Sequence, residues 1–241
     1  MSLFKAVVSY IREFDPKFSP IPATPDQIRL FESYVGRPLP LSYRSFLEVM
    51  GISQDWLLPH GFDLRIETAA RFYQTNRWLT EVSSYIRIGD DTQPPLAHPH
   101  LQVLSEHVEV VSIPDYTRET WPEAARFRTP VAGALDELVC MPVFEMFELG
   151  AEGRTQSKLV ASAQVPNGLE RTEALLARYG FSSLFFSSHT GHAYRHDAAA
   201  AKATQDYVHP LTVWVSADSP AFRAAITEIV AKELALTPAA A

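Results

Sequence analysis

Cysteine is nearly absent from this chain of 241 residues, which has Cys140 alone. A single cysteine excludes an internal disulfide bond and a zinc site made of cysteine pairs. Cys140 could serve as a nucleophile with a histidine as its base, but it lies in the apolar run Leu138–Met141. A free cysteine in such surroundings usually behaves as a small hydrophobic residue. We therefore expect Cys140 to belong to the core.

Long apolar runs and glycine-rich loops are also missing. No run approaches the roughly 20 apolar residues that a membrane span needs. The apolar stretch 6–11 is shorter than the core of a secretory signal and is bounded by charged residues. The ten glycines are not clustered, which excludes a phosphate-binding loop, and residues 181–184 lack the glycines of a Gly-x-Ser-x-Gly nucleophile elbow. We expect a cytoplasmic protein with no cofactor and no catalytic set.

Histidine is the residue type that keeps a catalytic or metal-binding role open. His189, His192 and His196 are spaced i, i+3 and i+7, so a helix would place them on one face, where they could bind zinc. Thr190-Gly191 instead favours a hairpin, which separates them. A second set surrounds Pro99 without regular spacing: His98, His100 and His107. We expect neither set to hold a metal, and a hydrolase that uses the C-terminal histidines remains a third alternative for the function.

Composition and charge define the class of protein and its partners. An apolar fraction of 46% and a charged fraction of 20% are typical of a globular protein. The net charge of −7 is uneven: residues 1–23 carry +1, residues 24–150 carry −8 and residues 151–241 are neutral. A negative field disfavours nucleic acid and favours a basic protein partner, whose association it accelerates. Alternatively, it is the ordinary mild acidity of a soluble protein.

The clearest local signals lie between Thr24 and Gly51. Thr24 and Gln27 form a capping box around Pro25 at the first helical position, and Gly36 is placed to end that helix. The apolar residues of this first helix recur at helical spacing: Ile28, Phe31 and Val35. Ser42 is the expected N-cap of a second helix, whose apolar stripe follows the same spacing: Tyr43, Phe46, Leu47 and Met50. The sequence therefore predicts two amphipathic helices joined by an elbow at residues 36–40.

This pattern resembles the opening of the SUKH superfamily, which includes Smi/Knr regulators of the fungal cell wall and immunity proteins of bacterial toxin systems. The matching residues are Ile28, Phe31, Glu32, Gly36, Leu39, Pro40, Tyr43, Phe46 and Leu47. Residues 85–91 match a strand that enters a Gly-Asp turn, and residues 131–149 resemble the helix that closes the domain. Met50-Gly51 departs from the Asn-Gly pair that often ends the second helix. The resemblance implies an α+β fold in which the helix pair packs on a mostly antiparallel sheet, and it supplies no catalytic residues.

The other elements expected in this part of the chain follow from periodicity and from proline and glycine. Residues 3–14 predict an amphipathic helix, followed by a proline-rich connector to residue 23. The remaining expectations are a helix over 68–83, a strand over 85–88, a turn at 89–91, a loop over 92–99, a hairpin from strands 101–104 and 108–113, and a helix over 130–149 that bends or breaks near Pro142.

Residues 151–236 predict a second, small α+β unit, for which we recognise no family. Its elements are a strand over 157–165, a helix over 169–179, a hairpin from residues 184–187 and 193–196, a strand over 211–215 and a helix capped by Ser219. The expected order is β-α-β-β-β-α, and residues 237–241 are expected to be disordered. The domain prediction is thus a helix and connector over 1–23, a SUKH-like domain over 24–150, and this unit.

Acidic loops and turns are the expected partner-binding surface. The predicted contact residues are Asp55, Asp63, Glu67, Asp90 and Asp91, with Trp56 as an apolar anchor. Asp90-Asp91 could also hold a metal, although a turn with two carboxylates is more often solvated. The leading interpretation is a noncatalytic immunity protein that occludes a basic, nuclease-like toxin with an acidic face. The alternatives are a regulatory scaffold of the Smi/Knr type or an adaptor of a secretion system.

Overall fold

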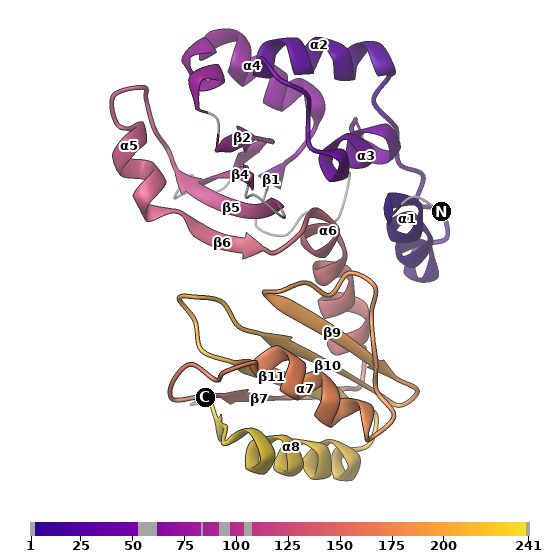
Figure 1. Cartoon of the computed structure of the whole chain (residues 1–241). Helices are drawn as coiled ribbons and strands as arrows, with labels where there is room; N and C mark the ends of the chain where they lie inside the picture. The colour runs from indigo at the N-terminus through magenta and orange to yellow at the C-terminus, as the bar shows by residue number, and fades with distance from the viewer. Residues whose placement is uncertain (1–2, 53–61, 83, 92–96, 104–107, 240–241) are drawn as a thin grey trace. The chain divides into compact units, whose positions relative to one another are not determined.

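The computed structural model describes residues 3–52, 62–82, 84–91, 97–103 and 108–239. The chain divides into two compact units, which we call unit 1 (Met1–Val139) and unit 2 (Cys140–Ala241). Each unit combines helices with antiparallel sheet, which confirms the predicted α+β class (Figure 1). No helix in these described ranges is long and apolar enough to cross a membrane.

Unit 1 has a helical part and a sheet. Its helices are α1 (Leu3–Phe14), α2 (Pro25–Val35), α3 (Leu41–Met50), α4 (Ile66–Thr75) and the short α5 (Trp121–Ala124), with 3₁₀ turns η2 (Arg77–Glu81) and η3 (Ala125–Phe127). The four-stranded sheet has the order β2 (Tyr85–Arg87), β4 (Ala97–Val103), β5 (Val108–Pro114) and β6 (Thr129–Ala132). A separate two-stranded ribbon pairs β1 (Phe62–Asp63) with β3 (Asp90–Asp91).

The helix pair α2–α3 forms as its local signals predict. The Thr24 Oγ1 accepts a hydrogen bond from the Gln27 amide at 3.2 Å, and Gly36 ends α2 with a φ of +77°. The elbow is fixed by Glu32, whose carboxylate accepts from the Leu39 amide at 3.1 Å. The predicted N-cap at Ser42 is wrong, because α3 begins at Leu41 directly after Pro40 and has no side-chain cap. The restricted φ of proline starts this helix without one.

Aromatic rings fill the core of unit 1 between the helices. Phe31 of α2 meets Tyr43 of α3 and Tyr73 of α4 edge to face, with ring centroids 6.2 Å and 5.7 Å apart. Phe46 of α3 contacts Phe4 of α1 in the same way, at 5.5 Å. All of these rings are fully or almost fully buried. Since truncating a buried phenylalanine to alanine costs about 3–5 kcal/mol, this cluster is a main source of stability for the unit.

Several predicted elements of unit 1 differ from the structure. The helix expected over 68–83 begins at Ile66 and ends at Thr75, because Asn76 leaves the helical conformation and its side chain caps the Phe72 carbonyl. The expected turn at 89–91 contains strand β3, and the expected loop over 92–99 ends in strand β4. Residues 129–132 form strand β6, so the expected helix over 130–149 begins at Leu135. Non-local strand pairing overrides the local pattern at β3, β4 and β6.

The helix α6 (Leu135–Phe144) contains the division between the units and holds Pro142 in its interior. Three residues after Pro142, the α-helical pattern changes to a π-helical turn, η4 (Glu145–Leu149). Proline has no amide hydrogen to complete the helical ladder, so the predicted irregularity near Pro142 is present. Cys140 is buried in this helix.

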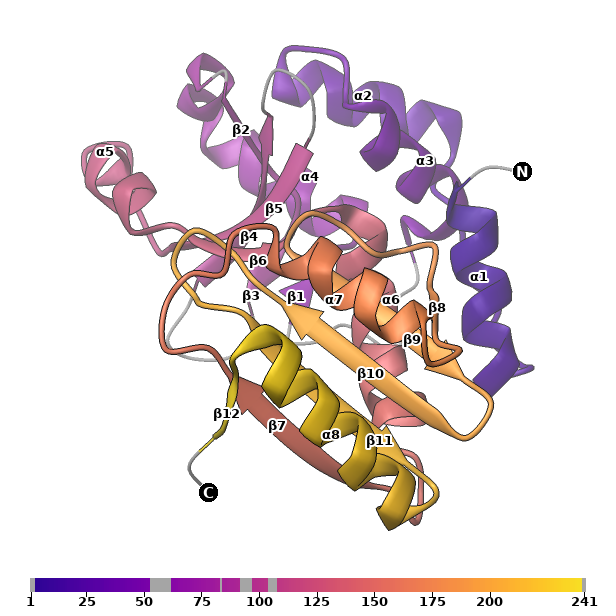
Figure 2. The same ribbon diagram turned by 60° about the horizontal axis from the view of Figure 1, so that its bottom comes forward.

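Unit 2 is a single antiparallel sheet covered on one face by two helices (Figure 2). Its elements are β7 (Thr155–Val160), α7 (Gly168–Ala177), β8 (Ser182–Ser183), β9 (Gly191–His196), β10 (Ala199–Thr204), β11 (Thr212–Ala217), α8 (Pro220–Leu234) and β12 (Thr237–Pro238). The strand order is β12-β7-β11-β10-β9-β8. Leucine, isoleucine and valine side chains from α7, α8 and the central strands form one core.

Strand β10 is the main element that sequence reasoning missed. It contains four alanines in six residues, and alanine is depleted in strands. Nevertheless β10 pairs along its whole length with β9 and β11. The expected order β-α-β-β-β-α therefore lacked two strands, β10 and the terminal β12. The strand expected over 157–165 ends at Val160, and the first hairpin strand is β8 at Ser182–Ser183 instead of residues 184–187.

The chain end of unit 2 also differs from its prediction. Thr237 and Pro238 pair with β7, and the Ala239 amide donates to the Lys158 carbonyl at 2.9 Å. The predicted disorder is thus wrong for residues 237–239, because the exposed edge of β7 offers hydrogen-bond partners to this segment. Residues 240–241 lie outside the described ranges.

Candidate partner-binding site

Four of the six predicted contact residues lie within the described part of unit 1. Asp63 is in β1, Asp90 and Asp91 form β3, and Glu67 is in the first turn of α4. The antiparallel register places Asp63 directly opposite Asp90, 27 positions further along the chain. We call this pair of strands, β1 and β3, the acidic ribbon. The other two predicted residues, Asp55 and Trp56, lie outside the described residues.

Gly89 allows the acidic ribbon to form. A Cβ atom at this position would lie 2.2 Å from the Asp63 carbonyl oxygen, which is well inside van der Waals contact. Only glycine permits this approach of the two backbones. The need for close backbone contact therefore explains why glycine precedes Asp90 in the Gly-Asp segment.

Asp63 is committed to contacts within the chain. Its carboxylate accepts hydrogen bonds from the Arg65 amide at 3.0 Å, the Arg65 Nη2 at 2.6 Å and the Thr68 Oγ1 at 2.8 Å. Partial burial acts to raise the pKa of Asp63, but the hydrogen bonds from Arg65 and Thr68 outweigh it and the pKa is lowered. Asp63 thus stabilises the start of α4 and presents only 17% of its side-chain surface to solvent.

Asp90 rests on a buried arginine. Its carboxylate pairs with the guanidinium of Arg87, whose side chain is only 3% exposed. The guanidinium stacks 3.6 Å from the centre of the Phe72 ring, and its Nε donates to the Gly89 carbonyl at 3.1 Å. The Arg87 Nη1 is buried without a hydrogen-bond partner among the described residues. Asp90 retains 39% exposure, so it can still contact a partner.

Asp91 and His98 hold the end of the ribbon to the sheet. The Asp91 Oδ2 accepts from the Ala97 amide at 3.0 Å, and the Asp91 amide donates to the His98 Nδ1 at 3.3 Å. Since Nδ1 is an acceptor, the neutral His98 carries its hydrogen on Nε2, which lies 3.3 Å from the Asp115 carboxylate. Burial and the nearby Arg87 charge lower the pKa of His98. These contacts give Asp91 a structural role.

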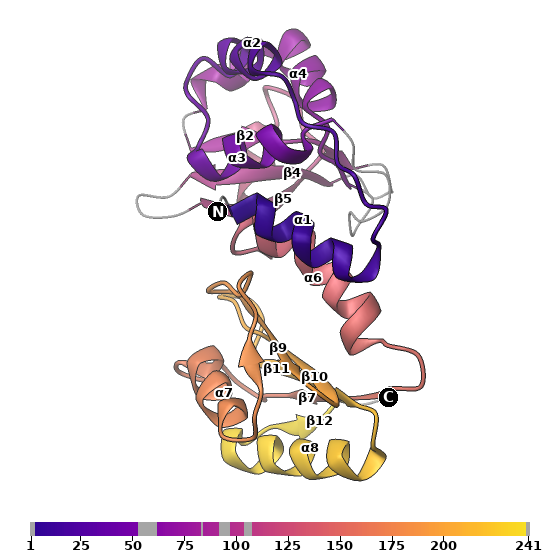
Figure 3. The same ribbon diagram turned by 90° about the vertical axis from the view of Figure 1, so that its right-hand side faces the viewer.

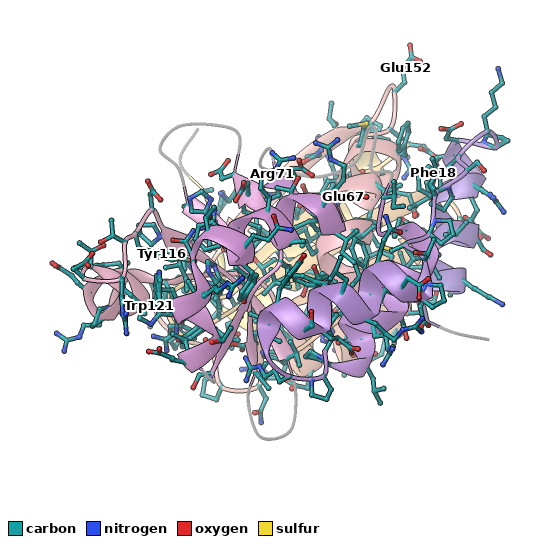
Figure 4. All side chains as sticks on the ribbon, turned by 90° about the horizontal axis from the view of Figure 1, so that it is seen from above. Phe18, Glu67, Arg71, Tyr116, Trp121 and Glu152 are labelled. Atoms are coloured by element: carbon teal, nitrogen blue, oxygen red, sulfur yellow. The ribbon has the colours of Figure 1, made fainter. Side chains whose placement is uncertain are left out.

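A second histidine lies deeper in unit 1. The Nδ1 of His100 donates to the His98 carbonyl at 2.8 Å, which leaves Nε2 to accept from the Tyr116 hydroxyl at 2.6 Å. Burial lowers the pKa of His100 well below its ordinary value and raises the pKa of Tyr116. The ring centroids of Trp121 and Tyr116 are 4.7 Å apart. Figure 4 labels both residues. This hydroxyl–imidazole pair is therefore a core contact, because His100 has no exposed surface.

The remaining predicted residue, Glu67, borders a groove between α2 and α4. The groove has a volume of about 350 Å³, and we call it the α2–α4 groove. Its lining combines apolar side chains with a polar rim: Leu30, Phe31, Tyr34, Ile66 and Ala70 with Gln27, Glu67, Arg71 and Gln74. Leu30 is 51% exposed there. Figure 3 shows the two helices next to one another, and Figure 4 shows Glu67 and Arg71 on α4.

The two helices of the groove run parallel. Their first turns are joined by Gln27, whose Nε2 donates to the Glu67 carboxylate at 3.2 Å, while Gly36 at the end of α2 lies against Thr80 just beyond α4. Asp26 lies in the first turn of α2 and Glu67 in the first turn of α4, where the helix dipole favours acidic side chains. These two carboxylates therefore stabilise their own helices, and both remain exposed to solvent.

Leu30 is the groove residue that sequence reasoning missed. It falls outside the buried stripe of α2, which the spacing of Ile28, Phe31 and Val35 defines. A large apolar residue on the polar side of an amphipathic helix was a usable signal, but the position of α4 that makes it part of a groove is a tertiary feature.

The C-terminal histidines of unit 2 have structural contacts. The His192 Nδ1 lies 3.0 Å from the Tyr194 hydroxyl and 3.3 Å from the Glu173 carboxylate. The His196 ring makes tilted contacts with the Phe181 and Phe222 rings, whose centroids are 5.1 Å and 5.2 Å away. Within the described ranges, no group of three or more histidine, cysteine, aspartate or glutamate side chains is arranged to hold a metal ion. His107 lies outside those ranges.

The charge of the chain is concentrated in unit 1. Counted over the full sequence, residues 1–139 carry 13 basic and 18 acidic side chains, a net charge of −5, and residues 140–241 carry 8 basic and 10 acidic ones, a net charge of −2. The acidic ribbon and the α2–α4 groove both belong to the more acidic unit.

Comparison of the chain with protein-family models, with curated proteins and with solved structures gave no match. The resemblance to the SUKH superfamily therefore rests on the residues of the helix pair and the Gly-Asp segment.

Proposed function

We propose that this chain is a noncatalytic protein-binding module of the SUKH type that acts in the cytoplasm as an immunity protein. It binds a basic toxin and covers the toxin's active site. The observation that carries this proposal is the α2–α4 groove, where the half-exposed Leu30 lies in the more acidic of the two units. Exposed apolar residues gathered in a depression are typical of protein interfaces.

Charge and apolar contact have separate tasks in this mechanism. The net charge of −5 on unit 1 attracts a basic partner and raises the association rate, and salt weakens this attraction. Within the complex, a few buried apolar contacts supply most of the affinity, while charged pairs at the rim select the partner. Among the predicted acidic contacts that the structure describes, Glu67 is exposed and Asp90 keeps 39% of its side-chain surface exposed.

The burial of a hydroxyl–imidazole pair in the core of unit 1 supports a binding role over hydrolysis. This pair consists of Tyr116 and His100, and His196 packs against the rings of Phe181 and Phe222. A substrate could not reach the imidazole of His100 without opening the core.

The test is neutralisation of the toxin-domain protein encoded beside the gene for this chain. Co-expression should restore growth, and calorimetry with the purified toxin should show binding whose affinity falls as NaCl rises from about 50 to 500 mM, where charge attraction is screened. Binding that does not respond to salt would contradict the electrostatic mechanism. A neighbouring gene without a toxin domain, together with binding to a housekeeping protein, would favour the scaffold alternative.

A further inference from the structure

The α2–α4 groove has features that specify the shape and charge of its occupant. On the basis of the proposed protein-binding function, we propose that it holds an amphipathic helix of the partner, which runs antiparallel to α2 and α4 and places a basic residue beside Glu67. A helix that lays its apolar face into a groove between other helices is a recurring mode of recognition.

The dimensions of the groove suit about two turns of helix. Its lining on α2 extends from Gln27 to Tyr34, and its lining on α4 from Ile66 to Gln74. At a rise of 1.5 Å per residue, these segments are roughly 10–12 Å long, which is the length of two helical turns. Two or three apolar side chains at i, i+3 or i+4, and i+7 on the partner would reach Leu30 and the floor.

The direction of the partner helix follows from the charges on the rim. Glu67 lies at the end where α2 and α4 begin, and Arg71 lies one turn further along α4. Helices favour acidic residues in their first turn and basic residues in their last turn. An antiparallel partner helix therefore brings its basic end to Glu67 and its acidic end toward Arg71, whereas a parallel one would oppose like charges. Its dipole would also oppose those of α2 and α4, which is favourable.

The probe is a set of stapled helical peptides of about 14 residues, long enough to present two turns and both charged ends. The first peptide has leucines at i, i+4 and i+7, acidic residues in its first turn and lysines in its last turn. The second has the same composition with the two charged ends exchanged. Nuclear magnetic resonance of the isotope-labelled full chain locates the binding site, and a titration gives each affinity.

A matched pair of variants controls for nonspecific contact. Leu30→Glu places a charge in the groove, and Leu41→Glu places the same charge on another exposed leucine of unit 1, which is 82% exposed at the start of α3. We expect shift changes confined to α2 and α4, an affinity about 5-fold lower for the charge-exchanged peptide, and an affinity at least about 10-fold lower for Leu30→Glu. Leu41→Glu should bind like the unchanged chain.

Four results would overturn the proposal. They are no binding at millimolar peptide, shift changes outside the groove, equal affinity for both peptides, and self-association of the chain that Leu30→Glu abolishes, since a second copy would then fill the groove. The two proposals fail separately. If Leu30→Glu neutralises the toxin as well as the unchanged chain does, the groove is not the binding site, but the immunity function stands. If the chain binds the peptide but not the toxin, the groove proposal stands and the immunity function is refuted.

Discussion

Unit 1 buries charged and titratable side chains, whereas unit 2 has few of them and builds its central strand from alanine. The buried polar residues of unit 1 that the structure describes are Thr68, Arg87, His98, His100, Asp136 and Glu137; those of unit 2 are Glu148, Thr172 and Ser216. Burying such groups is costly unless they are paired, so their concentration in unit 1 needs a reason. Arg87 and His98 hold Asp90 and Asp91, and thus the acidic ribbon, in place.

An arginine–carboxylate pair in each unit makes the comparison specific. Arg87 pairs with Asp90 while only 3% of its side chain is exposed, and Arg195 pairs with Glu148 through two hydrogen bonds while 37% is exposed. In unit 1 the arginine is the buried member of the pair, and in unit 2 it is the Glu148 carboxylate, which is 9% exposed. The buried member is the one that cannot lose its partner cheaply, because water does not replace it. Unit 1 buries more polar residues than unit 2 among the described residues, so it depends more on such contacts.

The largest expected effect comes from removing the buried arginine. Arg87→Ala deletes the stack on Phe72 and the pairing of Asp90, and we expect it to lower the free energy of unfolding by about 3 kcal/mol. Arg171→Ala is the control in unit 2 and should cost about 1 kcal/mol, since its hydrogen bond to the Glu233 carbonyl is exposed. Denaturant unfolding gives both values, and hydrogen exchange should show the loss in unit 1. Equal costs would contradict the distinction between the units.

A smaller loss of stability is expected from a substitution at Gly89, where the backbone lies close to that of Asp63. Gly89→Ala forces the new methyl group against the Asp63 carbonyl, so β1 and β3 should separate at a cost of about 2 kcal/mol. Gly153→Ala is the comparison, because Gly153 has a φ of +82° but open space around it, and only backbone strain of about 1 kcal/mol should result. Hydrogen exchange at β3 is the measurement, and unchanged protection there would refute this account of Gly89.

The buried histidines predict a pH dependence of unit 1. The pKa values of His98 and His100 are lowered in the folded protein, so the unfolded chain binds protons first as pH falls. Above the unfolded-state pKa of about 6.5, both histidines are neutral in either state and do not lower the free energy of unfolding. Below that pH, the free energy of unfolding falls by at most about 1.4 kcal/mol per pH unit for each histidine. We expect a loss of about 1–2 kcal/mol between about pH 7.5 and 5.5.

Substituting single histidines tests whether the buried ones cause this pH dependence. His100→Gln should reduce the slope of stability against pH, whereas His189→Gln, at an exposed histidine of unit 2, should leave it unchanged. Stability that rises as pH falls through this range would have the wrong sign for lowered pKa values.

The smallest of these stability effects should come from overpacking unit 2. Ala201 is fully buried in the middle of β10, and Ala201→Val adds two methyl groups to the core that α7 and α8 cover. We expect a cost of about 1 kcal/mol. Ala225→Val, on the exposed side of α8, should cost only about half of that through helix propensity. Thermal unfolding separates the two, and a stabilised Ala201→Val would show that β10 is loosely packed.

Sequence reasoning succeeded where the determinants are local. Helix α2 forms because Thr24, Gln27 and Gly36 each cap a few neighbouring residues, and its buried face follows from spacing alone. The same reasoning failed at β3 and β10. Asp90 and Asp91 become a strand only because Phe62 and Asp63 lie opposite them, and the alanines of β10 become one because β9 and β11 flank them.

The candidate site could be predicted only in part, for the same physical reason. The acidic residues were visible in the sequence, but the contacts that occupy Asp63 and Asp91 are made by Arg65, Thr68 and the Ala97 amide in the folded chain. Whether a carboxylate is free for a partner is decided by tertiary neighbours, and the groove beside Leu30 exists only once α2 and α4 are parallel.

The central claim is that unit 1 binds a protein partner through the α2–α4 groove. The most direct test is the dissociation constant of the neighbouring-gene toxin for the unchanged chain, for Leu30→Glu and for Leu41→Glu, measured side by side by calorimetry. The account predicts at least about 10-fold weaker binding for Leu30→Glu and an unchanged constant for Leu41→Glu. Equal constants for all three proteins would contradict it.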